Sequence, residues 1–360
     1  MKPKIRVLIV GCGRMGASHA RAYHQLSDDF EIVALVARGA DSRSKLNAEL
    51  GGGIPEFSDY HQALQTTKPS AVCISTYPDT HAEYAIAAME AGADVFLEKP
   101  VATNLVDAEK VVAKARETGR RLVIGYILHV HPSWHKFTEI AKTLGKPLVM
   151  RMNLNQQQSG SIWDLHKQLL DTATPVVDCG VHYVDIMCRM TASRPVRVSG
   201  IGARLAADIP QGQLNYGQLQ VVFEDGSVGW YEAGWGPMIS ETAFFVKDVM
   251  GPKGCVSIVA KSAAAAGNSS NIDAHSQTES LKIHYAALAP NGEFEKADEF
   301  VDVTDEPSHD ELCRREQEVF LNAIRTGSDL SAHWQSAVDS LRIVLGADVA
   351  MREGRTVSLL

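Results

Sequence analysis

The sequence predicts an α/β domain with a doubly wound parallel sheet, followed by an α+β domain with a mostly antiparallel, open-faced sheet. Three observations predict this fold class. Short apolar runs alternate with helical segments early in the chain, strand-like runs joined by short turns dominate later, and 360 residues are more than one core usually organises. We expect domains at residues 1–125 and 126–360, and the last helix can pack back on the first domain.

Strand-like and helical segments alternate along the first domain. The strand-like runs are Ile5–Val10, Glu31–Ala37, Ala71–Thr76, Asp94–Glu98 and Arg121–Tyr126. The helical segments are Gly16–Leu26, Ser42–Leu50, His81–Ala91 and Leu105–Thr118. Short apolar strands separated by amphipathic helices indicate βαβ units, and right-handed crossovers between them give a doubly wound sheet.

The second domain has a different pattern, in which strands follow one another directly. A helix at Pro132–Leu144, a strand at Pro147–Asn153, a polar loop at Asn155–Gly160 and a helix from Gly180 come first. The expected strands are then Val196–Ala203, Tyr216–Phe223, Ser227–Ala233, Glu241–Met250, Gly254–Val259 and Leu281–Ala286. Short turns between strands favour antiparallel pairing. An exposed loop at 263–280 and helices at Asp310–Thr326 and His333–Arg352 complete the expected elements.

Composition limits the classes of function. The chain is 45% apolar and 22% charged with a formal net charge of -8, which is typical of a globular protein and argues against nucleic-acid or anionic membrane partners. The apolar run Ile5–Val10 stops at Gly11 and is too short for a signal peptide or a membrane span. The six cysteines are scattered, without a paired zinc-binding pattern, so we expect a cytoplasmic protein.

A glycine motif follows the first strand. Gly11, Gly13 and Gly16 form GxGxxG together with Cys12, Arg14 and Met15, and the motif opens the first helix. The first glycine permits the tight turn, the second lets a pyrophosphate approach the backbone, and the third lets the helix pack on the strand. The motif in this context predicts a Rossmann domain that binds a dinucleotide at the helix N-terminus.

The end of the second strand bears on which dinucleotide binds. NAD-binding proteins usually place a carboxylate there for the ribose 2′-hydroxyl, whereas this chain has Ala37 and Arg38. A guanidinium can pair with a 2′-phosphate instead. We therefore favour NADP and keep NAD as the alternative, in which Arg38 is a solvated loop residue.

Further motifs resemble the glucose–fructose oxidoreductase, inositol dehydrogenase and rhizopine-catabolism family, written Gfo/Idh/MocA. These motifs are Ser75-Thr76-Tyr77-Pro78 with His81, Glu98-Lys99-Pro100, and Asp178-Cys179-Gly180-Val181-His182 with Asp185. The resemblance implies hydride transfer to or from sugars, cyclitols or related compounds, in a homodimer or homotetramer. It also implies that Ser75, Thr76, Tyr77, His81, Glu98 and Lys99 border the cofactor, and that the Lys99–Pro100 bond is cis.

Three residues are candidates for catalysis. Lys99 ends a parallel strand, where ligands bind in open α/β sheets, and a lysine there can stabilise a developing alkoxide. Asp178 and His182 lie four residues apart at the start of an expected helix, on one face. The imidazole of His182 suits proton transfer. The alternative interpretation makes Asp178 an N-cap and His182 a packed core residue. The catalytic interpretation requires Lys99 and His182 to converge beside the nicotinamide.

Other residues are candidates for contacts with the substrate. Trp163 and His166 follow a polar stretch and suit the apolar face and polar rim of a sugar, although Trp163 can equally anchor its loop. Tyr126 stands at the end of the fifth strand, followed by His129 and His131 rather than by a basic residue that relatives often carry. These histidines have no ligand spacing, so we expect no metal site.

The sequence therefore predicts an NAD(P)-dependent oxidoreductase acting on a small carbohydrate or polyol. Two alternatives stay open. One is cleavage of a glycoside by transient oxidation with a bound nicotinamide, with Lys99 and His182 as acid and base. The other is a non-catalytic sensor that binds a dinucleotide and regulates a partner, which would have no need of the Lys99, Asp178 and His182 set.

Overall fold

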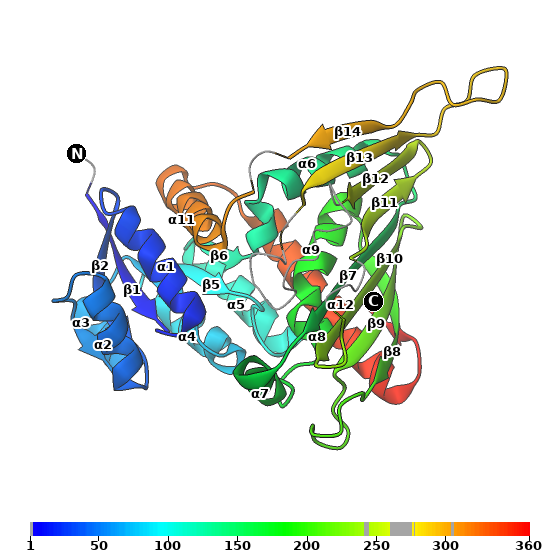
Figure 1. Cartoon of the computed structure of the whole chain (residues 1–360). Helices are drawn as coiled ribbons and strands as arrows, with labels where there is room; N and C mark the ends of the chain where they lie inside the picture. The colour runs from blue at the N-terminus through cyan, green and yellow to red at the C-terminus, as the bar shows by residue number, and fades with distance from the viewer. Residues whose placement is uncertain (1–2, 241–244, 260–275, 277, 304–305) are drawn as a thin grey trace. The chain divides into compact units, whose positions relative to one another are not determined.

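The computed structural model describes residues 3–240, 245–259, 276, 278–303 and 306–360. The chain divides into two compact units, Met1–Val130 with Ser308–Val338 and His131–Pro307 with Asp339–Leu360. Each unit carries one sheet, parallel in the first and mostly antiparallel in the second (Figure 1). The predicted fold class is therefore confirmed.

The first unit is built on six parallel strands in the order β3-β2-β1-β4-β5-β6. The strands are β1 (Ile5–Val10), β2 (Phe30–Val36), β3 (Glu56–Phe57), β4 (Ala71–Ile74), β5 (Asp94–Glu98) and β6 (Leu122–Gly125). The helices are α1 (Arg14–Gln25), α2 (Ala40–Glu49), α3 (Tyr60–Thr67), α4 (His81–Glu90), α5 (Leu105–Thr118) and α11 (His309–Thr326), with short 3₁₀ turns at Pro78–Thr80 and Ile127–His129. The strand order reverses between β1 and β4, and ligands of such sheets bind beside the carboxyl ends of the strands at this point.

Local sequence explains where the helices of this unit begin and end. The side chain of Asn104 accepts a hydrogen bond from the Asp107 N–H at the start of α5, and Gly119 ends that helix in the left-handed conformation. Ser308 and Gly327 do the same for α11. The buried face of α11, which includes Phe320, packs with α1 and the apolar side chains of the sheet. This last contact shows that a segment late in the chain completes the first core.

The second unit contains nine strands in the order β14-β13-β12-β11-β7-β10-β9-β8-β15. They are β7 (Val149–Gln157), β8 (Pro195–Ala203), β9 (Tyr216–Phe223), β10 (Val228–Gly236), β11 (Lys247–Gly251), β12 (Gly254–Val259), β13 (Ser280–Tyr285), β14 (Glu299–Asp302) and β15 (Val357–Ser358). The β7–β10 pair is parallel and the other pairs of this sheet are antiparallel. The helices are α6 (Pro132–Thr143), α7 (Gly160–Leu169), α8 (Pro175–Asp178), α9 (Gly180–Thr191) and the larger part of α12 (Ser331–Glu353).

The two faces of this second sheet differ in burial. Met152, Tyr231 and Val249 are fully buried on the face that the helices α6, α8 and α9 cover. Val149 and Val228 lie on the other face, where 38% and 36% of their surfaces are exposed. Because side chains alternate along a strand, this contrast identifies one covered face and one open face.

Some expected elements are wrong or were missed. The polar loop at 155–160 is instead the end of β7 and the start of α7, because the polar side chains of β7 find partners inside the unit. The elements α3, α7, α8, β3, β14 and β15 had no prediction, and most of these are short. The strand expected at Glu241–Met250 begins at Lys247, and residues 241–244 lie outside the described residues, as does most of the expected loop at 263–280.

Candidate functional site

The glycine turn after β1 is held in shape by contacts that leave no room for side chains at two positions. Gly11 has a φ of +99°, and a Cβ there would lie 2.3 Å from the carbonyl oxygen of Ser75. A Cβ on Gly16 would lie 1.9 Å from the carbonyl oxygen of Gly11. A Cβ on Gly13, by contrast, would meet no described heavy atom within 4 Å. Gly11 and Gly16 therefore build the turn, and Gly13 faces open space.

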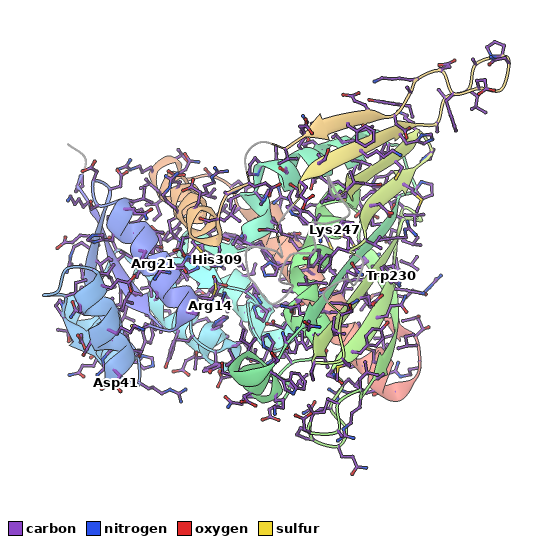
Figure 2. All side chains as sticks on the ribbon, viewed as in Figure 1. Arg14, Arg21, Asp41, Trp230, Lys247 and His309 are labelled. Atoms are coloured by element: carbon purple, nitrogen blue, oxygen red, sulfur yellow. The ribbon has the colours of Figure 1, made fainter. Side chains whose placement is uncertain are left out.

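The helix α1 starts at this open position. Gly13 is its N-cap, with no capping side chain, and the first turn holds no acidic residue, so backbone N–H groups and the positive helix end are available to an anion. Arg14 is exposed and has no hydrogen bond or ion pair among the described residues (Figure 2), while Met15 is half-buried. The turn therefore fits the pyrophosphate of a dinucleotide.

Two arginines follow β2 and behave differently. The Arg43 guanidinium donates to the carbonyl oxygens of Ala37 and Arg38 and lies 3.6 Å from the Glu56 carboxylate. Its role is to shape the loop. Arg38 is exposed, and its guanidinium has no partner among the described residues. The loop therefore presents one uncommitted cation and no carboxylate at Ala37 and Arg38.

The segment after β4 is tied to the segment after β5 through His81. This imidazole is fully buried, with Nδ1 2.7 Å from the carbonyl oxygen of Pro100 and Nε2 3.1 Å from that of Thr76. Burial lowers the pKa of His81, so the ring is neutral and donates to one carbonyl oxygen at a time. Tyr77 is 55% exposed and Ser75 packs against the glycine turn. The geometry makes His81 a positioning residue for these two segments.

The turn Glu98–Lys99–Pro100 is fixed through its glutamate. Glu98 is 6% exposed, and its Oε1 lies 2.6 Å from Nε2 of His19 on α1. Its Oε2 accepts a hydrogen bond of 3.2 Å from the backbone N–H of Lys99. The Lys99–Pro100 peptide bond is cis, and Lys99 is half-buried at the carboxyl end of β5. The carboxylate of Glu98 therefore anchors the backbone that carries Lys99.

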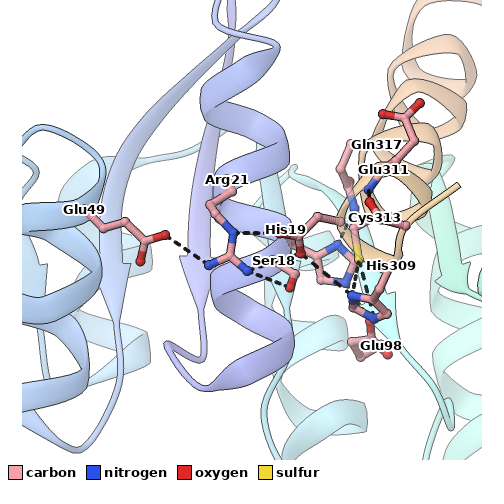
Figure 3. A network of polar contacts seen from close by, with 11 residues as sticks. Ser18, His19, Arg21, Glu49, Glu98, His309, Glu311, Cys313 and Gln317 are labelled. Atoms are coloured by element: carbon pink, nitrogen blue, oxygen red, sulfur yellow. Dashed lines mark hydrogen bonds and ion pairs between the residues drawn. The ribbon is translucent and has the colours of Figure 1, made fainter. Parts of the chain in front are cut away.

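A buried polar network between α1 and α11 continues from this anchor (Figure 3). Nε2 of Gln317 lies 2.9 Å from Nδ1 of His19, so both ring nitrogens of this histidine are engaged. Cys313 and Glu316 bring ligand-type atoms within 4.8 Å of His19. A metal ion would need a lone pair that His19 has already committed, so we interpret the cluster as a polar core. No sequence motif pointed to this network.

The carboxyl group of Glu316 differs from that of Glu98. It is 4% exposed, and one of its oxygens has no hydrogen-bond partner. Burial, with a smaller contribution from the charge of Glu98, raises the pKa of Glu316 well above its usual value. The Glu316 carboxyl group therefore favours its neutral form.

Tyr126 lies inside the first unit rather than on its surface. It is 2% exposed, its ring stacks on His129 at a centroid distance of 5.2 Å, and His333 meets it edge-on at 6.2 Å. A contact between Tyr126 and the substrate stays a prediction. Because the side chain is buried, it would have to move to make this contact.

In the second unit, Asp178 and His182 belong to two consecutive helical segments. Asp178 ends α8, Cys179 has helical dihedral angles, and α9 starts at Gly180. Asp178 is therefore not the N-cap of α9, contrary to the alternative derived from the sequence. Both Asp178 and His182 are half-buried and both make polar interactions. Helical geometry across the junction keeps the two side chains near the same face.

Trp163 and His166 lie on α7 and have different surroundings. The indole N–H of Trp163 donates to Asp208 at 3.1 Å, and the ring is 6% exposed, which supports its anchoring role. The His166 ring meets Trp235 edge-on at 4.7 Å. The indole N–H of Trp235 donates to Oε1 of Gln156 at 2.8 Å. This chain of contacts connects α7 with the end of β7.

The side-chain amide of Gln156 also connects His166 and Trp235 with Asp178. Sγ of Cys179 lies 3.5 Å from Oε1 of Gln156 and 3.7 Å from Oδ2 of Asp178. The structure thus brings His166 and Asp178 into one group through Trp235, Gln156 and Cys179. Gln156 was not predicted as a site residue, because its polar stretch favoured a loop at Asn155–Gly160.

Comparison with known proteins assigns the chain to a family. A model described as "Oxidoreductase family, NAD-binding Rossmann fold" matches residues 5–126, and a model of the GFO/IDH/MocA C-terminal domain matches residues 140–247. The chain belongs to the GFO/IDH/MocA family. The resemblance inferred from the short motifs is confirmed.

The curated relatives of this GFO/IDH/MocA protein match part of its length. It is 31% identical over 150 residues to 4-carboxy-2-hydroxymuconate-6-semialdehyde dehydrogenase of Sphingobium sp., over 42% of this chain and 47% of the relative. It is 31% identical over 149 residues to inositol 2-dehydrogenase 3 of Saccharopolyspora erythraea, over 40% of this chain and 43% of the relative. The match thus spans about half the length of these curated relatives.

A solved structure extends the likeness of fold to the whole chain. The myo-inositol 2-dehydrogenase of Lactobacillus plantarum matches with a TM-score of 0.77 at 20% sequence identity, over 99% of this chain and 100% of the other. At this level of identity the likeness shows the fold alone. Among the described residues, no helix is both long and apolar enough to cross a bilayer.

Proposed function

We propose that this protein is an NAD(P)-dependent dehydrogenase that moves a hydride between nicotinamide and a secondary alcohol or ketone of a sugar, cyclitol or related hydroxy compound. The observation that carries the proposal is the glycine turn, where Gly13 faces open space at an uncapped helix start with no acid in its first turn. The names of an inositol 2-dehydrogenase and of 4-carboxy-2-hydroxymuconate-6-semialdehyde dehydrogenase among the relatives support a small oxygenated substrate.

The proposed chemistry gives three residues separate roles. A nicotinamide cofactor held at the glycine turn of Gly11, Gly13 and Gly16 would supply the hydride chemistry at the reacting carbon. The ammonium of Lys99 donates a hydrogen bond to the reacting oxygen and stabilises its developing negative charge. The imidazole of His182 takes the hydroxyl proton in oxidation and returns it in reduction. Asp178 binds a neighbouring hydroxyl or orients one of the other two side chains. This arrangement requires Lys99 and His182 to meet at the substrate, which we keep as a prediction.

Several cofactor contacts follow from this proposal. Gly11, Gly13, Arg14, Met15 and Gly16 hold the diphosphate. We favour NADP because Arg38 is an uncommitted exposed cation and no carboxylate stands beside it. The residues Ser75, Thr76, Tyr77, His81, Glu98 and Lys99 border the nicotinamide side, with His81 and Glu98 acting by holding the backbone.

The experiment that tests the proposed function is an absorbance screen at the reduced-nicotinamide band. A panel of cyclitols, aldoses and hydroxy acids is tested with NAD and NADP on the intact protein. Lys99→Ala and His182→Ala should each reduce turnover by roughly 10²-fold or more, while the dissociation constant of the cofactor changes little. His61→Ala is the control, because His61 is exposed and pairs with Glu83 on the surface. Unchanged turnover in either site variant would remove that residue from the mechanism.

We also propose a homodimer or homotetramer built through the open face of the second sheet. A groove of about 450 Å³ on this face is lined by Val149, Arg151, Val222, Val228 and Trp230 among others. An apolar sheet face of this kind is usually covered in the native assembly. Trp230→Glu should shift the sedimentation coefficient toward that of a monomer, and an unchanged value would reject this surface.

Two further proposals follow from the sequence. The six cysteines are free in the structure, which supports a reducing, cytoplasmic location. We assign cofactor binding to the domain predicted at residues 1–125 and substrate binding to the domain predicted at 126–360, of which Ser308–Val338 packs with the first unit.

A further inference from the structure

One lysine of the second unit is buried and has no acidic partner in the part of the chain that the structure describes. Lys247 begins β11 and is 5% exposed. No described residue forms a hydrogen bond or an ion pair with its amine, which lies 4.7 Å from the centre of the Phe245 ring. Other lysines of this unit, such as Lys146 and Lys167, pair with the carboxylates of Asp225 and Asp208. Lys247 is therefore unusual within its own unit.

The position of Lys247 is fixed by the register of three strands. Lys247 pairs with Met152 on β7, and Met152 pairs with Tyr231 on β10, so the three side chains lie in one row on one face. Met152 and Tyr231 are fully buried, which identifies this face as the one that the helices cover. Figure 2 shows Lys247 on the side of the sheet where α9 lies. Its amine therefore belongs to the interior side, not to the open face.

The same row meets the first turn of α9. Tyr183 stacks on Tyr231 with ring centres 5.1 Å apart, and a Cβ on Gly180 would come within 2.9 Å of the Tyr231 ring. Neighbouring strands are ~4.8 Å apart, so the backbone of Lys247 is about 10 Å from that of Tyr231. The turn that contacts Tyr231 also carries His182. Lys247, with its long flexible stem, thus stands close to the helix start that holds the proposed proton acceptor.

The neighbouring acid does not neutralise this amine. Asp248 is the next residue, and its side chain points to the opposite face of the sheet because residues alternate along a strand. There it forms a two-pronged ion pair with Arg151, with contacts of 2.9 Å and 2.5 Å. Asp248 is therefore committed elsewhere.

A buried ammonium without a counter-charge is costly, so proteins rarely retain one without a function. Burial lowers the pKa of Lys247 to about 8, which still leaves most of the amine charged at neutral pH. In apolar surroundings this charge attracts an anion more strongly than it would in water. A single ammonium balances one negative charge, which matches a carboxylate, whereas a phosphate dianion would need further donors.

We propose that Lys247 binds the carboxylate of a hydroxy-acid substrate, such as a sugar acid, and so selects acidic over neutral polyols. This inference rests on the proposed dehydrogenase function and adds the substrate class to it. The carboxylate lies at one end of the substrate, and the carbon that exchanges the hydride lies at a hydroxyl further along the same molecule.

The first experiment measures selectivity with matched substrates. The intact protein is assayed with a sugar acid, the corresponding neutral alditol and the corresponding sugar phosphate, and kcat/KM is compared among them. We expect the acid to be the preferred substrate of the wild type. Lys247→Met should reduce the acid-to-alditol ratio of kcat/KM by about 100-fold or more, of the order measured when one partner of a buried charge pair is removed. Lys247→Arg should keep part of it, and Lys253→Met, on an exposed turn residue, should leave it unchanged.

Three results would overturn the proposal: preference for the alditol, preference for the phosphate, or an unchanged ratio in Lys247→Met. A second experiment separates failure of this proposal from failure of the proposed function. The lysine Cε and Nζ resonances are followed by NMR during titration with gluconate and, separately, with glucitol, and the Lys247→Met spectrum identifies the Lys247 signal. A shift of that signal with gluconate alone supports the carboxylate site even in a protein that oxidises nothing. No shift with gluconate rejects it even in an active dehydrogenase.

Discussion

The burial of Lys247 predicts a pH-dependent cost to the folded state. Its pKa falls from 10.5 to about 8 because burial disfavours the charged amine. Between these two values the unfolded chain binds more protons than the native protein, so the free energy of unfolding rises with pH across this window. One pKa unit corresponds to ~1.4 kcal/mol, so the cost is about 3 kcal/mol at pH 7. The same relation gives about 2 kcal/mol at pH 9 and about 0.4 kcal/mol at pH 10.5.

This cost is measured by comparing the wild type with Lys247→Met in urea unfolding between pH 7 and pH 10.5. The variant should be the more stable protein at pH 7, and its advantage should shrink by about 3 kcal/mol over the range. Changes in packing at the methionine add a constant that does not depend on pH, and other titrating groups cancel between the two proteins. Lys253→Met, at an exposed position, should show no such trend. An advantage that stays constant with pH would mean that the Lys247 amine is solvated, and the argument for an anion site would lose its physical basis.

Predictions for four variants address the first unit. Gly13→Ala should fold normally, since its Cβ meets no described atom within 4 Å. Its methyl group should keep the pyrophosphate from the backbone and raise the dissociation constant of the dinucleotide about tenfold or more (~1.4 kcal/mol), as measured by fluorescence titration. Gly16→Ala, whose Cβ would lie 1.9 Å from a backbone oxygen, should instead lower the free energy of unfolding by roughly 1–3 kcal/mol. Equal melting temperatures for Gly13→Ala and Gly16→Ala would refute the predicted difference in stability. Arg38→Gln should weaken NADP binding by roughly 10-fold or more and leave NAD binding nearly unchanged, and an equal loss for both cofactors would show that Arg38 does not contact the 2′-phosphate. Glu316→Gln should stabilise the protein at pH 7. The raised pKa of Glu316 makes the wild type lose stability as the pH rises above 4.5. In thermal unfolding, the gain in stability of the variant should therefore vanish below pH 4.5.

The sequence predicts the first unit well because its information is local. Apolar runs define the strands, and the glycine spacing at Gly11, Gly13 and Gly16 requires a turn that the structure contains. The helix α5 has the predicted bounds, since Asn104 caps its start and Gly119 ends it in the left-handed conformation. What local patterns do not contain is the contact between α1 and α11, which are separated by nearly the whole chain. The sequence alone therefore could not predict that Gln317 on α11 is the partner of His19.

The second unit is harder to predict because polar residues fill its interior. Gln156 is 3% exposed and binds the Trp235 indole, yet a glutamine-rich stretch in a sequence favours a loop. Lys247 similarly occupies a buried strand position where periodicity leads one to expect an apolar residue. The Asp178 and His182 motif was recognised, but the break between α8 and α9 was not predicted. Cys179, at the break, keeps helical dihedral angles and is not a residue type that ends helices. The periodicity of apolar residues indicates which positions are buried on average. A buried polar residue such as Gln156 is an exception that depends on its partners in the folded protein.

The exceptions themselves divide into two kinds, and the difference bears on function. His19 and Glu98 are buried and hydrogen-bonded to each other at 2.6 Å. The side-chain amide of Gln317 binds the other ring nitrogen of His19, and Glu98 accepts a hydrogen bond from the Lys99 N–H. Groups satisfied in this way gain nothing from a ligand, so their contribution is to fix a backbone. Lys247 is buried, and among the described residues no carboxylate pairs with its amine, so an anionic ligand would balance its charge. Substitution at His19 should therefore disturb the presentation of Lys99 for every substrate, whereas substitution at Lys247 should discriminate between substrates by their charge.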